Sequence, residues 1–182
     1  MSARFLEKNE YLKTKELAIE CFGNEDGFFD DYYKPDAFIY SGRIAVRELD
    51  GKIVSMAHMV PMLARINDGK LSVTADNGKS SSAAAGSVTA DAMAGGRYEG
   101  KVYYILCVAT TGSERHHGYM DEVMELICET LKNEGFSWTF LVPVNKDIYR
   151  HLGFKYDIPF DPDCAELLCA DDGLTECSIR QL

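Results

Sequence analysis

The sequence predicts an α/β (α+β) fold in a single domain spanning residues 1–182, and two patterns support this. A strand–helix–strand pattern over residues 102–142 indicates a right-handed parallel crossover. An Asp-Gly turn within residues 41–60 indicates an antiparallel hairpin. A chain of 182 residues is long enough to bury one core.

The first elements are predicted to be helical. Residues 10–22 form the first predicted helix, and the sequence Gly23-Asn24 would end it. Its apolar positions, at roughly helical spacing, are Leu12, Leu17, Ala18 and Ile19. Residues 27–35, an aromatic and acidic cluster, indicate a second short helix.

A hairpin follows. Residues 44–49 and 53–60 are rich in apolar and β-branched side chains and flank Asp50-Gly51. This dipeptide is a strong signal for a type I′ turn between two strands.

Residues 67–100 have a different composition, dominated by Ser, Ala, Gly, Asp and Thr. The pentapeptide Ser-Val-Thr-Ala-Asp occurs at residues 72–76 and again at 87–91. Such a segment buries little apolar surface, so we expect a mobile loop or an extended hairpin tip. A surface insertion and a lid over a substrate remain the two alternatives for its role.

The crossover begins with a strand at residues 102–110 that is apolar enough to be buried on both faces. Residues 118–134 form its helix, which Gly135 ends, and residues 137–142 form its second strand. One stripe of that helix is apolar and consists of Met120, Val123, Met124, Ile127 and Leu131. Residues 174–182 are the predicted last strand.

Composition narrows the function classes. The net charge of −10 argues against nucleic acid or an anionic membrane as a general partner and is compatible with a cationic small-molecule substrate. No apolar run approaches the roughly 18–20 residues that span a bilayer, and residues 1–8 do not resemble a signal peptide. The six cysteines form no Cys-x-x-Cys pair and the four histidines are scattered, so we expect reduced thiols, a cytoplasmic protein and no metal site.

The turn after residues 102–110 is the candidate anion site. It reads Arg115-His116-His117-Gly118-Tyr119-Met120 and opens directly into the predicted helix. A glycine at that point lets backbone N–H groups approach a phosphate, and the helix dipole adds roughly half a positive charge. An arginine can add charge-assisted hydrogen bonds, so the turn indicates a pyrophosphate site.

A second segment follows residues 137–142. It contains Asn145, Tyr149 and Gly153-Phe154, and we expect a short helix with Asn145 and Tyr149 on one face. Together, the turn and this segment resemble the GNAT-type N-acetyltransferases. That family has a phosphate loop Arg/Gln-x-x-Gly-x-Gly/Ala and, downstream, Asn-x-x-x-Tyr-x-x-x-Gly-Phe.

The sequence is most similar to the subgroup named for enhanced intracellular survival. Val108-Ala109-Thr110 on the strand and Met120 at the last loop position match that subgroup, and Met120 departs from the broader pattern. The resemblance covers residues 100–156, extends back to the predicted helix at residues 10–22, and excludes residues 67–100. Members of the subgroup usually continue into further C-terminal domains, including one like a sterol carrier protein.

The resemblance implies a central mixed, twisted sheet whose parallel strands, 102–110 and 137–142, splay apart around the pantetheine arm of acetyl-CoA. Backbone groups of the first strand would bind pantetheine, and the Val108 N–H would stabilise the oxyanion. The implied cofactor-binding residues are Leu106, Cys107, Val108, Arg115, His116, His117, Gly118, Tyr119, Met120 and Asn145. Asn145 would either bind pantetheine or cap its helix, and the two histidines would either contact phosphate or face solvent.

Tyr149 is the implied catalytic residue, a general acid that protonates the leaving thiolate; a phenol with a pKa near ~10 matches a thiolate of similar basicity. The general base is left open among a water chain and four acidic residues: Glu25, Asp26, Asp30 and Asp31. The neighbouring aromatic residues either line an acceptor pocket or pack in the core: Phe28, Phe29, Tyr32 and Tyr33.

The predicted function is therefore transfer of an acetyl group from acetyl-CoA to a primary amine of a small molecule or peptide, by direct attack. The alternative is a non-catalytic acyl-CoA-binding or sensor module of the same fold. Nucleophilic chemistry at Cys107 is disfavoured, because no histidine is placed near it by the sequence. The sequence does not define the oligomeric state, and a homodimer is compatible with it.

Overall fold

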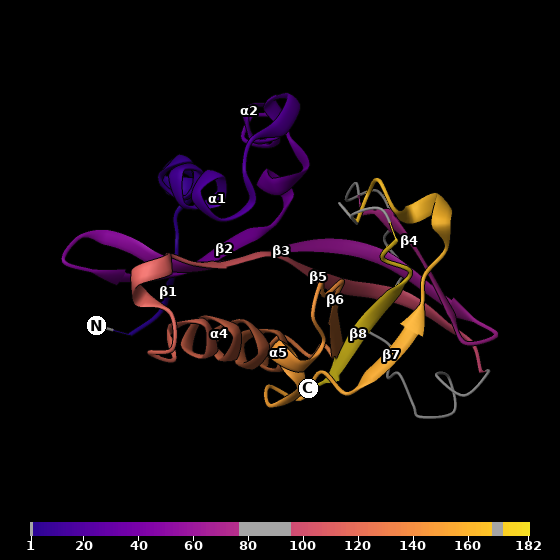
Figure 1. Cartoon of the computed structure of the whole chain (residues 1–182). Coiled ribbons are helices and arrows are strands. Elements are labelled where there is room, and N and C mark those ends of the chain that lie inside the picture. The colour runs from indigo at the N-terminus through magenta and orange to yellow at the C-terminus, as the bar shows by residue number, and fades with distance from the viewer. Residues whose placement is uncertain (1, 77–95, 169–172) are drawn as a thin grey trace. The chain divides into compact units, whose positions relative to one another are not determined.

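The computed structural model describes residues 2–76, 96–168 and 173–182, which contain both helices and strands (Figure 1). Within these residues the strands are β1 (Arg4–Phe5), β2 (Arg43–Leu49), β3 (Lys52–Asn67), β4 (Lys70–Ala75), β5 (Tyr98–Thr110), β6 (Trp138–Leu141), β7 (Tyr156–Pro159) and β8 (Glu176–Gln181). The α-helices are α1 (Lys15–Phe22), α2 (Phe28–Tyr32), α4 (Tyr119–Asn133) and α5 (Asp147–Arg150). The 3-10 helices are η1 (Lys8–Thr14), η2 (Glu25–Gly27), η3 (Phe38–Ser41), η4 (Gly112–Glu114) and η5 (Pro162–Cys164).

The strands form a mixed sheet. Their order is β1-β2-β3-β5-β6-β8-β7, with β4 paired to β3. β5 and β6 are parallel, whereas β2 pairs with β3, and β8 with β6 and β7, in antiparallel register. The predicted α/β (α+β) class is confirmed, as are the crossover and the last strand. No helix of the described residues is long and apolar enough to cross a membrane.

The contacts divide the chain into two compact units. The first unit comprises Met1–Val60 and Ile105–Cys128, and the second comprises Pro61–Tyr104 and Glu129–Leu182. Each is discontinuous in sequence, because β3, β5 and α4 each pass from one unit into the other. The single domain expected for residues 1–182 stays a prediction.

The hairpin of the first unit follows the prediction. Leu49 pairs with Lys52, so Asp50 and Gly51 form a two-residue turn. Their φ angles are 50° and 80°, as a type I′ turn requires at both positions. On α4, the predicted apolar residues Val123 and Met124 are fully buried. The polar turn and the apolar stripe thus fold as their local patterns predict.

The first predicted helix is only partly α-helical. Residues 10–14 belong to the 3-10 helix η1, and α1 begins at Lys15. Thr14 donates its hydroxyl hydrogen bond to the Tyr11 carbonyl at 2.7 Å, which is the kind of local bond that competes with α-helical pairing. Leu12, placed by the sequence on the apolar face, is exposed instead.

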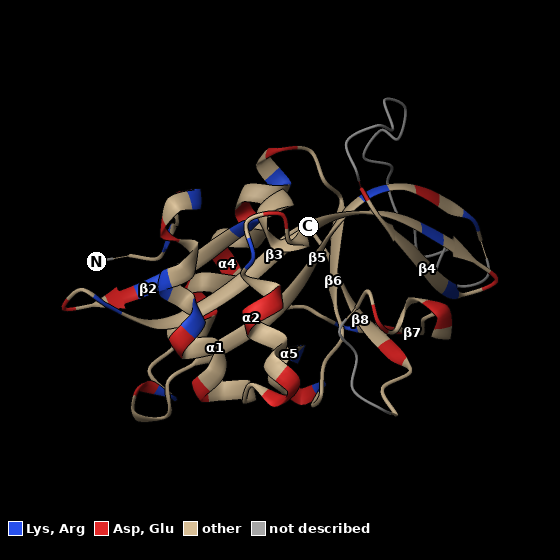
Figure 2. Cartoon of the chain, turned by 90° about the horizontal axis from the view of Figure 1, so that it is seen from above, with Lys and Arg blue, Asp and Glu red and all other residues tan. Residues whose placement is uncertain are grey.

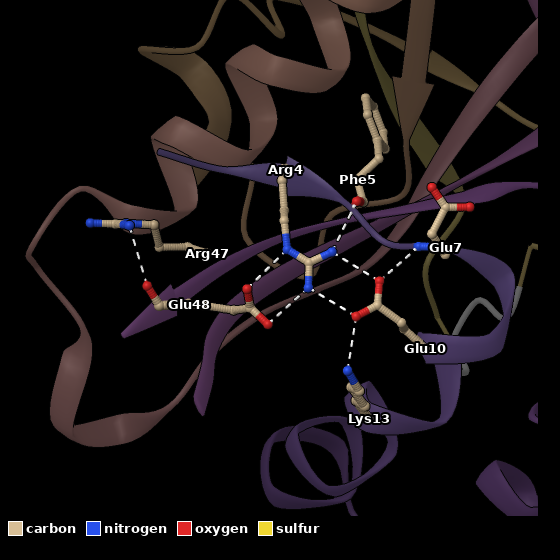
Figure 3. Close-up of polar contacts among 7 residues, drawn as sticks. All are labelled: Arg4, Phe5, Glu7, Glu10, Lys13, Arg47 and Glu48. Carbon is tan, nitrogen blue, oxygen red and sulfur yellow. Dashed lines mark hydrogen bonds and ion pairs between the residues drawn. The ribbon is translucent and has the colours of Figure 1, made fainter. Parts of the chain in front are cut away.

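A network of ion pairs ties β1 to its neighbours (Figure 3). Arg4 donates from Nε to Glu48 on β2 and from a terminal nitrogen to Glu10 on η1, both at 2.9 Å. Lys13 also donates to Glu10, at 2.8 Å. These charges are partly exposed, so the network orients a two-residue strand more than it stabilises the fold.

The second unit corrects the prediction for residues 67–100. Lys70–Ala75 is strand β4, which pairs with β3 through the two-residue turn at Asp68 and Gly69. Leu71 and Val73 are buried, because β4 alternates apolar and polar residues. The end of the segment belongs to β5. Residues 77–95, which include the second pentapeptide, lie outside the described residues.

β4 also contacts the chain that follows β7. Leu71 forms a parallel bridge with Phe160, and the Asp161 N–H donates to the Leu71 carbonyl at 2.8 Å. The strand path of this unit, from β4 through β3, β5, β6, β8 and β7, thereby returns to its first strand. Large side chains fill its interior, among them Trp138, Phe140 and Phe154.

The cysteines of the described residues are thiols. Cys128, Cys164 and Cys177 are buried, and burial raises the pKa of Cys177 to about 12. They therefore pack as small apolar side chains, as the sequence predicts. Cys169 lies outside the described residues.

Candidate functional site

The middle of β5 carries an unusual backbone conformation. Cys107 has a φ of 48°, although it is not glycine and stands inside a strand. A left-handed residue within a strand is typical of a bulge, which twists the strand and re-aims its backbone groups. Leu106 before it is buried, whereas Cys107 and Val108 are half-buried. This left-handed φ angle belongs to Cys107, one of the three residues to which the family resemblance assigns pantetheine binding.

Hydrogen bonds join the end of β5 to β3 just after Cys107. The Thr111 N–H donates to the Val54 carbonyl at 2.9 Å, and the Ser55 hydroxyl donates to the Ala109 carbonyl at 3.1 Å. The end of β5 is therefore held firmly against β3. This rigid edge fixes the point from which the next turn departs.

The predicted phosphate loop leaves β5 through η4 and enters α4. His116 and Gly118 have φ angles of 66° and 80°, and residues 115–118 are exposed. The Glu122 N–H donates to the Gly118 carbonyl at 3.1 Å, so Gly118 stands immediately before the helix. The first N–H groups of a helix have no partner within it. A Cβ added at Gly118 would meet no atom within 4 Å, so the approach to these groups is open.

The start of the loop is anchored to α1. Glu20 accepts hydrogen bonds from the Thr111 hydroxyl at 2.5 Å and from the Gly112 N–H at 3.2 Å. These two bonds, the first above all, lower the pKa of Glu20. Arg115 donates from Nε to the Thr110 carbonyl at 3.2 Å, so part of its guanidinium binds the strand end. Contact of Arg115 with phosphate stays a prediction.

The second unit holds the other predicted residues. α5 contains only Asp147–Arg150, so the expectation that Asn145 lies on this helix is wrong. Asn145 precedes it and accepts the Asp147 N–H at 3.0 Å, an Asx-type turn that competes with helix extension. The residue that caps α5 is Lys146, so pantetheine binding and helix capping by Asn145 both stay predictions.

Tyr149 lies on α5, with its ring edge-on to Phe154 at 6.1 Å between centroids. Burial raises the pKa of Tyr149 to about 12. Its hydroxyl is therefore protonated throughout the neutral range and can act only as a proton or hydrogen-bond donor there.

Ion pairs hold both ends of α5. Lys146 pairs with Glu176 on β8, and Arg150 pairs with Asp157 on β7. Asp157 also accepts the Ser178 hydroxyl at 2.5 Å. Burial acts to raise the pKa of Asp157, but the hydrogen bonds from Arg150 and Ser178 outweigh it and lower that pKa. A helix of four residues is thus fixed by side chains from two strands.

Known proteins resemble this chain in sequence and in fold. Residues 72–156 match a family model described as an acetyltransferase (GNAT) domain. A probable N-acyltransferase from Enterococcus faecalis is 17% identical, with a TM-score of 0.57, over 84% of this chain and 32% of that one. The chain has the GNAT fold. No curated protein matches the sequence.

Two further structures share the GNAT fold. Eis1 from Mycobacterium abscessus is 11% identical, with a TM-score of 0.57, over 87% of this chain and 33% of that one. A GNAT family acetyltransferase from Brucella melitensis, in complex with acetyl-CoA, is 15% identical, with a TM-score of 0.52, over 84% of this chain and 81% of that one. The chain spans about a third of the length of the first structures that it matches.

These similarities also bear on the predicted limits of the resemblance. The family match begins at residue 72, so it extends into the segment that the sequence analysis excluded. At 11% identity the likeness to Eis1 shows the GNAT fold, and the subgroup stays a prediction.

The acidic and aromatic candidates lie on η2 and α2, except for Tyr33, which directly follows α2; Figure 2 shows acidic residues on α2. Asp30 accepts from Lys15 at 2.5 Å, and this bond is the main cause of its lowered pKa. Asp31 pairs with Lys34. Both carboxylates are thus paired with lysines, and the lowered pKa makes Asp30 a weaker base than an unpaired aspartate.

Three of the four aromatic candidates pack in the core. Phe29, Tyr32 and Tyr33 are buried, and Phe28 is exposed. Only Phe28 therefore has the accessibility that an acceptor pocket requires.

Beside these rings lies a buried polar pair, Tyr32 and His58, that was not predicted from the sequence. His58 on β3 is fully buried, and its Nδ1 lies 2.8 Å from the Tyr32 hydroxyl. Its Nε2 has no hydrogen-bond partner. The sequence signal was a lone histidine inside the apolar run of residues 53–60.

Proposed function

We propose that the chain belongs to the GNAT family and transfers an acetyl group from acetyl-CoA to a primary amine of a small molecule or peptide. The GNAT fold and the family match over residues 72–156 support this proposal. The observation that carries it is the open turn at Gly118, which leads from the bulged strand β5 into α4. We further propose a single domain, a cytoplasmic location, and neither nucleic acid nor membrane as a partner.

In this proposal the pyrophosphate of acetyl-CoA binds the N–H groups of residues 115–120. Side chains of Arg115, His116 and His117 add contacts to phosphate. Backbone groups of Leu106, Cys107 and Val108 bind the pantetheine arm, and the Val108 N–H stabilises the oxyanion. The left-handed φ of Cys107 supports this role, because a bulge turns backbone groups out of the regular ladder.

Tyr149 acts as the acid in the proposed reaction. The amine attacks the thioester carbonyl, the C–S bond breaks, and Tyr149 donates to the leaving thiolate. Full proton transfer from the Tyr149 hydroxyl, whose pKa is about 12, to the thiolate is uphill, because an ordinary thiol has a lower pKa, about 8.5 for cysteine. The hydroxyl therefore stabilises the thiolate first by a hydrogen bond, and the proton follows where desolvation also raises the pKa of the thiol.

The acceptor amine arrives as an ammonium and loses a proton before attack. The proton acceptor is a water chain or one of Glu25, Asp26, Asp30 and Asp31; the ion pair with Lys15 lowers the pKa of Asp30 and makes it the weaker candidate. The net charge of −10 supports a cationic acceptor.

The test is release of CoA from acetyl-CoA across a panel of primary amines, with Tyr149→Phe as the variant. We expect kcat to fall about 100-fold and the affinity for acetyl-CoA to stay unchanged, as removal of a general acid predicts. Tyr156→Phe is the matched control, since this exposed tyrosine lies on the neighbouring strand β7. Unchanged turnover in Tyr149→Phe would exclude its acid role. Binding of acetyl-CoA without turnover of any amine would favour the non-catalytic module.

A further inference from the structure

The first turn of α4 carries a charge that opposes its proposed ligand. Asp121 and Glu122 both lie in this turn. Carboxylates there interact favourably with the helix dipole, but they compete with a bound anion for the same partial positive charge. A pyrophosphate beside this turn would also be repelled by Glu122, whose side chain is 42% exposed.

Arg47 on β2 meets this turn from within the same unit. Its Nε lies 3.1 Å from Glu122 Oε2, an ion pair by distance that lacks hydrogen-bond geometry, and only 11% of its side chain is exposed. A terminal nitrogen donates to the Glu48 carbonyl at 3.2 Å, which fixes the plane of the guanidinium (Figure 3).

The same guanidinium lies over the ring of Tyr119, 5.2 Å from its centroid. Tyr119 in turn stacks on His117, with 5.7 Å between the ring centroids. One arginine thus contacts the first and the fourth residue of α4, and through Tyr119 it reaches the loop. Arginine suits this place better than lysine, because its planar group can pair and stack together.

We propose that Arg47 is a positioning residue for the anion site: it neutralises Glu122 and holds Tyr119, so that the first turn of α4 can accept a pyrophosphate. This inference rests on the proposed function, which supplies the phosphate-bearing ligand. The proposed role of Arg47 differs from that of a purely structural ion pair in one respect. If the pair only holds the loop, loss of either partner weakens anion binding; if Arg47 offsets a repulsive charge, loss of Glu122 does not.

The test measures dissociation constants by calorimetry for acetyl-CoA, for inorganic pyrophosphate and for acetyl-pantetheine, which lacks the phosphates. For Arg47→Met we expect the Kd of acetyl-CoA and of pyrophosphate to rise about fivefold, the effect of a first-turn charge of about 1 kcal/mol. The Kd of acetyl-pantetheine should not change. Glu122→Gln should bind both phosphate ligands at least as tightly as the unaltered chain.

The double variant Arg47→Met/Glu122→Gln decides between the two explanations. Removal of both charges should return the Kd of pyrophosphate to within about twofold of the unaltered chain, because no repulsive charge remains. Arg65→Met is the matched control: Arg65 also pairs with a glutamate, Glu99, but both side chains are largely exposed. It should leave all three constants unchanged.

Three results with the variants would each overturn the inference: an unchanged Kd in Arg47→Met, weaker binding in Glu122→Gln, or no recovery in the double variant. Glu122→Gln carries the test alone where Arg47→Met does not fold, since Glu122 is half-exposed. Pyrophosphate separates this inference from the proposed function. Binding of pyrophosphate with the expected variant pattern, but no binding of acetyl-CoA, contradicts only the proposed function; no binding of pyrophosphate to the unaltered chain overturns the inference.

Discussion

His58 makes the stability of the fold depend on pH. The imidazole is fully buried on β3, with the Tyr32 hydroxyl 2.8 Å from Nδ1 and no partner at Nε2. Burial lowers the pKa of His58 to about 3. The folded chain therefore holds this side chain neutral, whereas the unfolded chain protonates it below its ordinary pKa of about 6.5.

The direction in which stability changes with pH follows from the two protonation states of His58. Because the pKa of His58 is depressed by folding, its neutral form is accommodated above pH 6.5, and stability is lost as the pH falls from there toward 3. Each pH unit in that window costs about 1.4 kcal/mol. Between pH 6.5 and 4.5 the loss from this one group is about 2–3 kcal/mol, a large share of the roughly 5–15 kcal/mol that stabilises a domain.

Urea unfolding at pH 7 and at pH 4.5 tests this prediction. We compare the unaltered chain with the double variant Tyr32→Phe/His58→Phe. Both members of the hydrogen-bonded pair are replaced, so that neither polar group stays buried without its partner. The difference in unfolding free energy between the two pH values should be smaller by about 2–3 kcal/mol in the variant. His151→Gln is the control, since this histidine is exposed and should keep the unaltered pH dependence. An equal pH dependence in the double variant and the unaltered chain would refute the reasoning.

Two further predictions concern stability. Gly51→Ala should lower the unfolding free energy by about 1 kcal/mol, because the turn requires a φ of 80° that alanine adopts with strain; an unchanged urea midpoint would contradict the assigned turn. Asp157→Ala should cost about 1–3 kcal/mol in the same assay, because Arg150 and the buried Ser178 lose their shared acceptor. Glu166→Ala, an exposed carboxylate, should change neither quantity.

Local patterns predicted the elements whose stability is decided locally. Asp50-Gly51 specifies its turn because both residues tolerate a positive φ, and the structure has that turn. The apolar stripe of α4 has the helical period, and Val123, Met124 and Ile127 are fully buried. In each case the signal lies within a few residues of the element that it predicts.

β4 shows how composition can hide such a signal. The dipeptide Asp68-Gly69 repeats the turn of the first hairpin, and residues 70–75 alternate polar and apolar side chains. The surrounding Ser, Ala and Gly residues led to the expectation of a mobile loop or an extended hairpin tip, and not of a buried strand. Pairing with β3 decides the outcome, because it buries Leu71 and Val73 against the rest of the second unit.

The contacts that anchor the candidate site are long-range, so no local pattern reveals them. Glu20 meets Thr111 across 91 positions of sequence. Arg47 meets Glu122 and Tyr119 from another strand, and nothing in the run of residues 43–49 distinguishes it from a solvent-exposed arginine. The sequence motif located the loop, but the side chains that fix its two ends come from α1 and β2.

Cys107 connects these observations to the proposed chemistry. The other left-handed residues of the described chain are glycine, aspartate or His116 and lie outside regular strands, whereas Cys107 has a φ of 48° within β5. A non-glycine residue in this conformation costs roughly 1–2 kcal/mol. Strain of this kind persists where the surrounding structure over-determines it, and β3 does so here by pairing with the residues just after the bulge. The strained Cys107 and the buried Arg47 lie in the same unit, and the proposed binding of acetyl-CoA at residues 106–120 would give both of them a role.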